Sequence, residues 1–284
     1  MNIKIPYTPR KHQSYLHQQI NKHRWSVLVC HRRFGKTVCM INHLIKSALM
    51  CPHKNPRFAY IAPTFKQAKS IAWDYMKQFT DKIPSTKFNE TELRVDLPNG
   101  SRITLLGAEN SDGLRGIYLD GCVIDEYANI DGKLFAEIIR PALSDRKGYC
   151  VFIGTPAGMN NNFYDLYQHA NGAEDWFNYK AKASDTKIVD QEELDKAKEV
   201  MGEKKYLQEF ECDWIANIEG AIYGEEISNL DDKKQLARVP YDPTLPVSTA
   251  WDLGVADLSR KIFFQQKGTA IQVIYYHEER GHGL

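Results

Sequence analysis

WSVLVCHRRFGKT occupies residues 25–37. The apolar start of this segment predicts a buried β-strand, and residues 36–50 have apolar side chains at helical spacing. A loop that ends a strand, contains Gly-Lys-Thr and opens a helix is the context of a phosphate-binding P-loop. We expect Lys36 to neutralise charge on the β- and γ-phosphates and Thr37 to place its hydroxyl on Mg²⁺. Cys30 stands where the usual motif begins with glycine, so these residues alone leave a chance match open.

A second motif, CVIDE at residues 122–126, strengthens this interpretation. It predicts an apolar strand that ends in two adjacent acids, and ionised carboxylates there are costly unless they bind a metal or polarise water. Asp125 would coordinate Mg²⁺, directly or through water, and Glu126 would orient and deprotonate the attacking water. An acid pair of this kind is also found in solvated turns, but together the two motifs predict a Mg²⁺-dependent ATPase.

Two weaker signals fit the same site. Gln13 lies in an N-terminal segment before the P-loop and would bind the adenine edge; the alternative is an ordinary surface glutamine. Thr155 follows the apolar run YCVFIG and would sense the γ-phosphate, and the alternative there is a simple turn at the end of a strand.

Apolar strands alternate with amphipathic helices through the first part of the chain. Strands are expected at residues 25–29, 58–62, 121–125 and 149–153, helices at 36–50 and 65–79, and a hairpin around 98–100. This order is typical of an α/β fold with a mainly parallel sheet that is flanked by helices.

The later part of the chain changes character twice. Residues 172–240 are more charged and are expected to be mostly helical, whereas three short strands in a β-meander are expected after a proline-containing boundary. The predicted domains are an ATPase core at residues 1–171, a lid or linker at 172–245 and the start of another domain at 246–284.

Composition sets limits on the partners of the chain. Its 284 residues are 43% hydrophobic and contain 37 Lys and Arg against 36 Asp and Glu, so any contact with DNA would need a local basic patch. The six cysteines lack metal-ligand spacing and are expected to be buried free thiols. No apolar run approaches the ~20 residues of a membrane span, and the N-terminus has no signal-peptide pattern. We therefore expect a soluble intracellular protein without a membrane partner.

Five motifs in order resemble large terminase subunits of tailed bacteriophages. They are CHRRFGKT, YIAPTFKQA, GLRGIYLDGCVIDEYA, FIGTPAG and WDLGVADLS. The resemblance implies a P-loop ATPase of the ASCE or RecA-like kind, an ATP-hydrolysing motor that moves double-stranded DNA into a procapsid. It also implies a ring, usually a pentamer, that contacts a portal protein and a small terminase subunit in the host cell cytoplasm.

The same resemblance assigns roles to the arginines. In this family the P-loop commonly lacks its first glycine and contains an arginine, which by register is Arg32. A second arginine that reaches the ATP of a neighbouring subunit is by register Arg115, with a structural ion pair as the alternative. Arg33, Phe34 and Gly35 complete the nucleotide-binding loop, and Arg33 has no assigned role.

The family also carries an RNase H-like nuclease after the ATPase. Asp252, at the end of VSTAWDL, matches the first carboxylate that binds Mg²⁺ or Mn²⁺ there, and Asp257 lies in the following turn. Residues 246–284 are fewer than the ~100 or more of a complete domain, so we expect this chain not to cut DNA alone.

Two other functions stay open from the sequence. One is a helicase-like P-loop ATPase, and the other is a nucleotide-binding relic without turnover. Lys66, Lys69, Arg146 and Lys147 are candidate DNA contacts, although each is also consistent with an ordinary solvated charge.

Overall fold

The computed structural model describes residues 5–214, 239–252 and 259–279. The chain forms two compact units, Met1–Gly220 and Ala221–Leu284, and each is described by itself. In the described part of the chain, no helix combines the length and the apolar character that crossing a membrane requires. All six cysteines are free, and all except Cys51 are buried.

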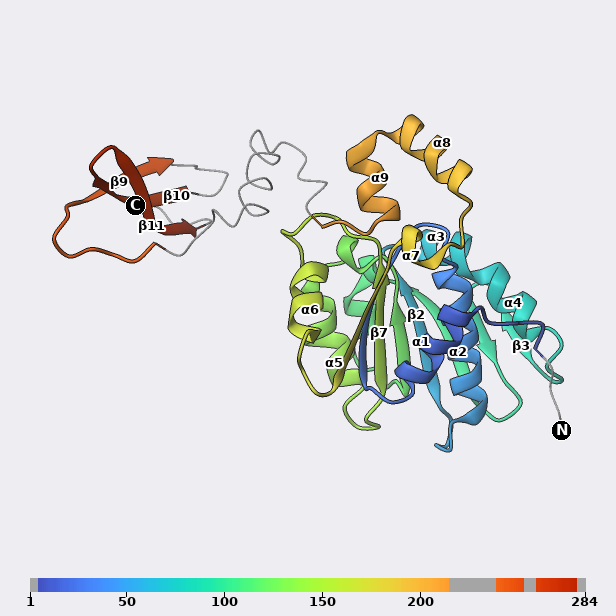
Figure 1. Ribbon diagram of the computed structural model, residues 1–284. Helices are drawn as coiled ribbons and strands as arrows, with labels where there is room; N and C mark the ends of the chain where they lie inside the picture. Colours follow the sequence, from blue (N-terminus) through green and yellow to red (C-terminus); the bar gives the residue numbers. More distant parts are fainter. Residues whose placement is uncertain (1–4, 215–238, 253–258, 280–284) are drawn as a thin grey trace. The chain divides into compact units, whose positions relative to one another are not determined.

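An eight-stranded sheet forms the centre of the first unit (Figure 1). Its strands are, in spatial order, β3 (Lys87–Asn89), β4 (Arg94–Asp96), β5 (Arg102–Gly107), β2 (Arg57–Ala62), β6 (Gly121–Ile124), β7 (Tyr149–Gly154), β1 (Trp25–Cys30) and β8 (Trp176–Ala181). All neighbours from β5 to β8 are parallel, whereas β3, β4 and β5 pair antiparallel. The predicted parallel strands and the β4–β5 hairpin are therefore confirmed.

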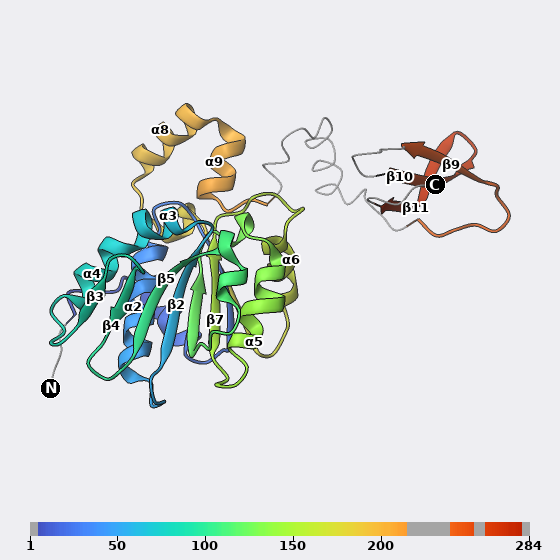
Figure 2. The same cartoon turned by 180° about the vertical axis from the view of Figure 1, so that it is seen from behind.

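Helices cover both faces of this sheet (Figures 1 and 2). In the described part of this unit the α-helices are α1 (Lys11–Ile20), α2 (Lys36–Met50), α3 (Phe65–Ala68), α4 (Asp74–Thr80), α5 (Arg140–Ala142), α6 (Asn162–Ala170), α7 (Ala183–Thr186), α8 (Gln191–Met201) and α9 (Glu203–Phe210). One hydrophobic cluster packs α1, α2 and α4 against Leu28 and Cys30, and another packs α5 and α6 against Val27 and Val29. Alternate residues of β1 thus face opposite layers, as the pleat of a strand requires.

Two segments differ from the sequence expectation. The helix expected at residues 65–79 contains a π-helical turn, Lys69–Trp73, between α3 and α4. Residues 172–240 were expected to be mostly helical, and the helices α8 and α9 confirm this in part, but β8 also lies there and pairs with β1 at the sheet edge. Residues 215–238 of this range lie outside the described residues. Most residues of β8 are only partly buried, so the strand does not need a continuous apolar run. Its sequence, WFNYKA, mixes polar and apolar residues and therefore did not indicate a strand.

After β8 the chain continues into the helices α7, α8 and α9. Figure 1 shows α8 and α9 beyond the ends of β7 and β2, with α7 between them and the sheet. Ala183, Leu194 and Phe210 form a small hydrophobic core that joins α7, α8 and α9. This helical segment therefore lies where the parallel strands end, which is the usual position of ligand sites in such sheets.

The second unit contains a three-stranded antiparallel sheet. Its strands are β9 (Val247–Asp252), β10 (Ser259–Lys267) and β11 (Ala270–Glu279), with β10 in the middle. The predicted β-meander is thus confirmed.

Candidate nucleotide-binding site

The P-loop connects β1 to α2. β1 ends at Cys30 and α2 begins at Lys36, with Gly35 directly before the helix. Gly35 has φ 86°, a left-handed conformation that glycine adopts readily. A Cβ at this position would also lie 3.1 Å from Nε2 of Gln13. A larger residue would therefore disturb the start of α2, where a phosphate is expected to bind.

Gln13 is held against this loop by two hydrogen bonds. Its Oε1 accepts from the Arg10 N–H at 2.9 Å, and its Nε2 donates to the Gly35 carbonyl at 3.2 Å. The Arg10 guanidinium donates to the Phe34 carbonyl at 3.3 Å. Gln13 is only 4% exposed, so its interpretation as an ordinary surface residue is wrong. The start of α1 thus supports the P-loop, and contact of Gln13 with adenine stays a prediction.

The two predicted acids lie beside the P-loop lysine. Asp125 follows β6 directly, and its N–H donates to the Ile61 carbonyl at 2.8 Å. Lys36 Nζ lies 3.3 Å from Glu126 Oε1. Glu126 has φ 49°, an uncommon conformation for a residue with a side chain. The fold therefore brings Lys36, Asp125 and Glu126 together at the carboxyl ends of parallel strands.

Burial alters the protonation of this cluster. Desolvation and then the charge of Glu126 raise the pKa of Asp125 to about 6. Burial opposes the charge of Lys36, but attraction to Glu126 and Asp125 raises its pKa above the ordinary value. Lys36 therefore stays charged at neutral pH, and a further cation beside Asp125 would favour its ionised form.

Tyr60 is bonded to one of the predicted Mg²⁺ ligands. Its hydroxyl donates to Asp125 Oδ2. Tyr60 lies on β2 and is fully buried. Sequence reasoning missed this residue, because a tyrosine inside the apolar run FAYIA is indistinguishable from a core aromatic until the partner of its hydroxyl is known.

The oxygen atoms of Thr37 and Asp125 fit a Mg²⁺ ion. Hydroxyl and carboxylate oxygens are the ligands that Mg²⁺ accepts alongside water and nucleotide phosphates. Asp125 is 2% exposed and sits beside the second carboxylate of Glu126. Thr37 and Asp125 would hold the ion, directly or through water, and the ion would neutralise charge on the phosphates.

A cavity of about 490 Å³ opens above Lys36 and Glu126. Arg32 and Thr155, both predicted to contact phosphate, also line it. The lid helix α9 contributes further side chains to it, which the sequence did not indicate because they come from a charged segment distant in the chain. Lys36, Glu126, Arg32 and Thr155 thus face one space large enough for phosphates.

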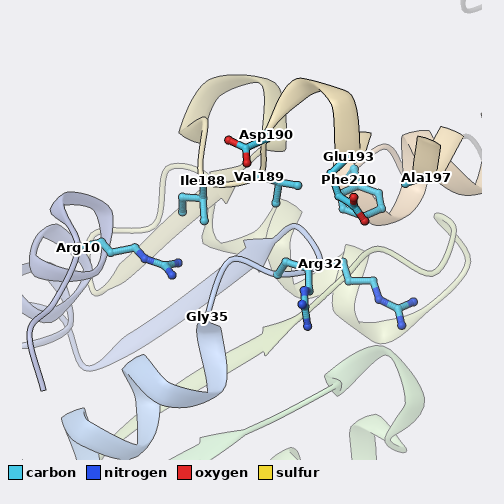
Figure 3. Close-up of a pocket in the computed structure, with 10 residues that line it drawn as sticks. Arg10, Arg32, Gly35, Ile188, Val189, Asp190, Glu193, Ala197 and Phe210 are labelled. Carbon is cyan, nitrogen blue, oxygen red and sulfur yellow. The ribbon is translucent and has the colours of Figure 1, made fainter. Parts of the chain in front are cut away.

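A second cavity of about 740 Å³ lies on the other side of the P-loop (Figure 3). Arg10 points into it from the start of α1, and Arg32 lies below it on the P-loop. Ile188 and Val189, from the connection between α7 and α8, cover its upper side in this view. Apolar side chains next to arginines suit a planar base joined to a charged group.

The comparison with known families decides which family the chain belongs to. A family model described as "Terminase large subunit, T4likevirus-type, N-terminal" matches residues 29–229, well over half of the chain. The chain belongs to this terminase family. The matched region includes the P-loop, Asp125, Glu126 and α9.

Individual terminases resemble the chain at low identity. The large subunit of Escherichia phage T5 is 24% identical over 266 residues, covering 90% of this chain and 57% of the T5 protein. The large subunit of Thermus virus P23-45 is 27% identical over 182 residues, covering 57% of this chain and 36% of that protein. The chain therefore spans only part of the length of these relatives.

Solved terminase structures share the fold. The large terminase ATPase domain of Thermus phage P74-26 superposes with a TM-score of 0.63 at 21% identity, over 74% of this chain and 95% of that one. A large terminase from a thermophilic bacteriophage gives 0.64 at 14% identity, over 96% of this chain and 69% of that one. The predicted α/β terminase fold is thus confirmed.

The remaining P-loop residues of this terminase chain occupy different surroundings. Arg33 has φ 71° and lines the larger cavity. The Phe34 ring is fully buried between His12 and His31, so only its backbone is available to a nucleotide. Arg115 is exposed and does not line either cavity beside the P-loop. Its action on a neighbouring subunit stays a prediction.

Asp252 lies in the second unit, on the last position of β9. Its carboxylate is 3.7 Å from Arg260 Nη1, and Arg260 Nε is 4.0 Å from Glu278 Oε2. In the described part of the chain, Asp252 belongs to no group of three acids, histidines or cysteines close enough to share a metal. These described residues therefore do not by themselves fit a two-metal nuclease centre, and Asp257 lies outside the described residues.

The guanidinium group of Arg146 makes contacts within the folded chain. Its Nη1 lies 3.4 Å from Asp120 Oδ1 and donates to the Lys54 carbonyl at 3.1 Å. The other Asp120 oxygen accepts the N–H of Arg57 at 2.7 Å. The proposed DNA contact of Arg146 is therefore less plausible than a structural role, while Lys66, Lys69 and Lys147 are not buried.

Proposed function

We propose that this chain is the ATP-hydrolysing part of a motor that packages double-stranded viral DNA. The observation that carries the proposal is the approach of Lys36 to Glu126, with buried Asp125 directly behind it, at the start of α2. The large terminase of a thermophilic bacteriophage, which shares this fold, has been solved with ADP and with ATP-gamma-S. We propose that a nucleoside triphosphate is the ligand of the site formed by Lys36, Asp125 and Glu126.

Each residue has a defined task in the proposed reaction. Lys36 and the N-terminus of α2 bind the phosphates, while Thr37 and Asp125 hold Mg²⁺. Glu126 orients a water molecule for in-line attack on the γ-phosphate and accepts its proton. Arg32 stabilises the charge that develops on the phosphate oxygens.

We also propose the oligomeric state, the partners and the location of the motor, on the basis of its family. We propose that it acts as a homo-oligomeric ring, a pentamer, at the portal of the procapsid in the host cytoplasm. It receives DNA from a small terminase subunit, and Arg115 reaches the ATP of the neighbouring subunit. The β-meander is proposed to begin a metal-dependent nuclease domain.

The decisive experiment compares two glutamates. Glu126→Gln removes the water-orienting carboxylate and should lower Mg²⁺-dependent ATP turnover by at least about 100-fold, with ATP binding retained. Glu137→Gln removes an exposed carboxylate outside both cavities and should stay close to the parent rate. Equal activity of Glu126→Gln and the parent chain would exclude this role of Glu126.

Two outcomes would favour the alternatives. Strand separation of a forked duplex would indicate a helicase-like enzyme. Nucleotide binding without turnover, at a protein concentration high enough for ring assembly, would indicate a relic.

A further inference from the structure

The lid helix α9 forms one side of the phosphate cavity. Lys205, Gln208 and Glu209 all line the cavity that also contains Lys36 and Glu126. These three residues are spaced at i, i+3 and i+4, so they share one face of the helix. α9 therefore presents a continuous polar face to the site.

Buried hydrogen bonds fix this helix in place. Gln208 is 4% exposed, and its Nε2 donates to the Pro156 carbonyl at 2.5 Å. The N–H of Arg32 donates to the carbonyl of Glu209 at 2.7 Å. α9 is thus joined both to the P-loop and to the loop that follows Thr155.

Lys205 places a positive charge at the cavity that Lys36 and Glu126 line. Its Nζ lies 3.1 Å from Glu209 Oε1 and donates to Gln208 Oε1 at 3.1 Å. The Lys205 side chain remains 47% exposed, whereas that of Glu209 is 14% exposed. The ammonium group therefore keeps access to the cavity, and a phosphate oxygen would offer it a strong charged acceptor.

We propose that Lys205 binds the terminal phosphate of a nucleoside triphosphate and so makes the lid helix part of the nucleotide site. This inference rests on the proposed ATPase function. Lys36 is proposed to bind the phosphates from the P-loop side, and its ammonium group is paired with Glu126. Lys205 approaches from α9, which is anchored beside Thr155, the residue expected at the γ-phosphate. An ammonium group beside the expected position of the γ-phosphate favours a triphosphate, because a diphosphate has no phosphate there.

The test measures equilibrium binding of ATP-gamma-S and of ADP, each with Mg²⁺, to the full chain. Lys205→Met should weaken ATP-gamma-S binding about tenfold, the effect of one charge-assisted hydrogen bond, and should change ADP binding less than about twofold. Lys205→Arg should restore most of the preference for the triphosphate. Lys204→Met, which removes the exposed neighbouring lysine outside this cavity, is the matched control and should bind both nucleotides like the parent.

The possible outcomes separate the two proposals. If the parent chain prefers ATP-gamma-S and Lys205→Met keeps that preference, the role of Lys205 is overturned while the nucleotide site stands. Equal weakening of both nucleotides would also overturn it, because it would indicate a loss of lid structure. If the parent chain binds neither nucleotide, the proposed function itself fails.

Discussion

At the scale of single residues, the role of Tyr60 depends on the partner of its hydroxyl group. Its hydroxyl donates to the carboxylate of Asp125, a predicted Mg²⁺ ligand that follows the neighbouring strand β6. Tyr60 is therefore placed to orient this carboxylate.

We expect Tyr60→Phe to weaken Mg²⁺ use. Loss of the hydroxyl removes a hydrogen bond that favours ionised Asp125, so the Mg²⁺ concentration for half-maximal ATPase should rise about tenfold or more. Tyr164→Phe, at a partly buried tyrosine of α6 that lines neither cavity beside the P-loop and accepts a hydrogen bond from Gln168, should leave this concentration unchanged. An unaltered Mg²⁺ dependence in Tyr60→Phe would contradict the orienting role.

At the scale of elements, α1 and α2 are packed through a pair of stacked histidines. The rings of His17 and His43 are 5.3 Å apart and nearly parallel, and their Nδ1 atoms are 3.1 Å apart. His17 Nε2 also bonds the hydroxyl of Tyr7 at 3.0 Å. Burial lowers the pKa of His17 to about 4 and that of His43 to about 3. Both rings are therefore neutral in the folded protein at neutral pH.

This pair should make the ATPase unit sensitive to mild acid. Below pH ~6.5 the unfolded chain binds protons at both histidines, whereas the folded chain does not until much lower pH. The free energy of unfolding should thus fall by on the order of 2 kcal/mol per histidine between pH 7 and pH 5. Urea unfolding at several pH values measures this, and a His17→Asn/His43→Asn variant should show a smaller loss. An equally steep pH dependence in that variant would assign the effect to other groups.

At the scale of the whole molecule, the chain combines the proposed nucleotide site in one unit with a small sheet in the other. The carboxylate of Asp252 is 76% exposed and is close to Arg260 rather than to another described acid. We therefore expect no cleavage of plasmid DNA by this chain in Mn²⁺, because a two-metal centre needs several carboxylates. Gel analysis of plasmid incubated with Mn²⁺ measures this. Cutting that disappears in Asp252→Ala would show that the second unit is already a nuclease.

Local sequence was sufficient to predict most strands of the sheet and the residues that the fold brings together at the P-loop. The apolar strands, the GKT loop and the Asp125–Glu126 pair lie in short segments whose periodicity and charge are visible without the fold. β8 was missed because an edge strand that is only partly buried has no long apolar run. The hydrogen bond from Tyr60 to Asp125, the burial of Gln13 and the position of α9 at the cavity of Lys36 and Glu126 were decided by tertiary structure alone. Each depends on side chains from distant segments meeting at the ends of parallel strands, and a linear pattern carries no information about such meetings.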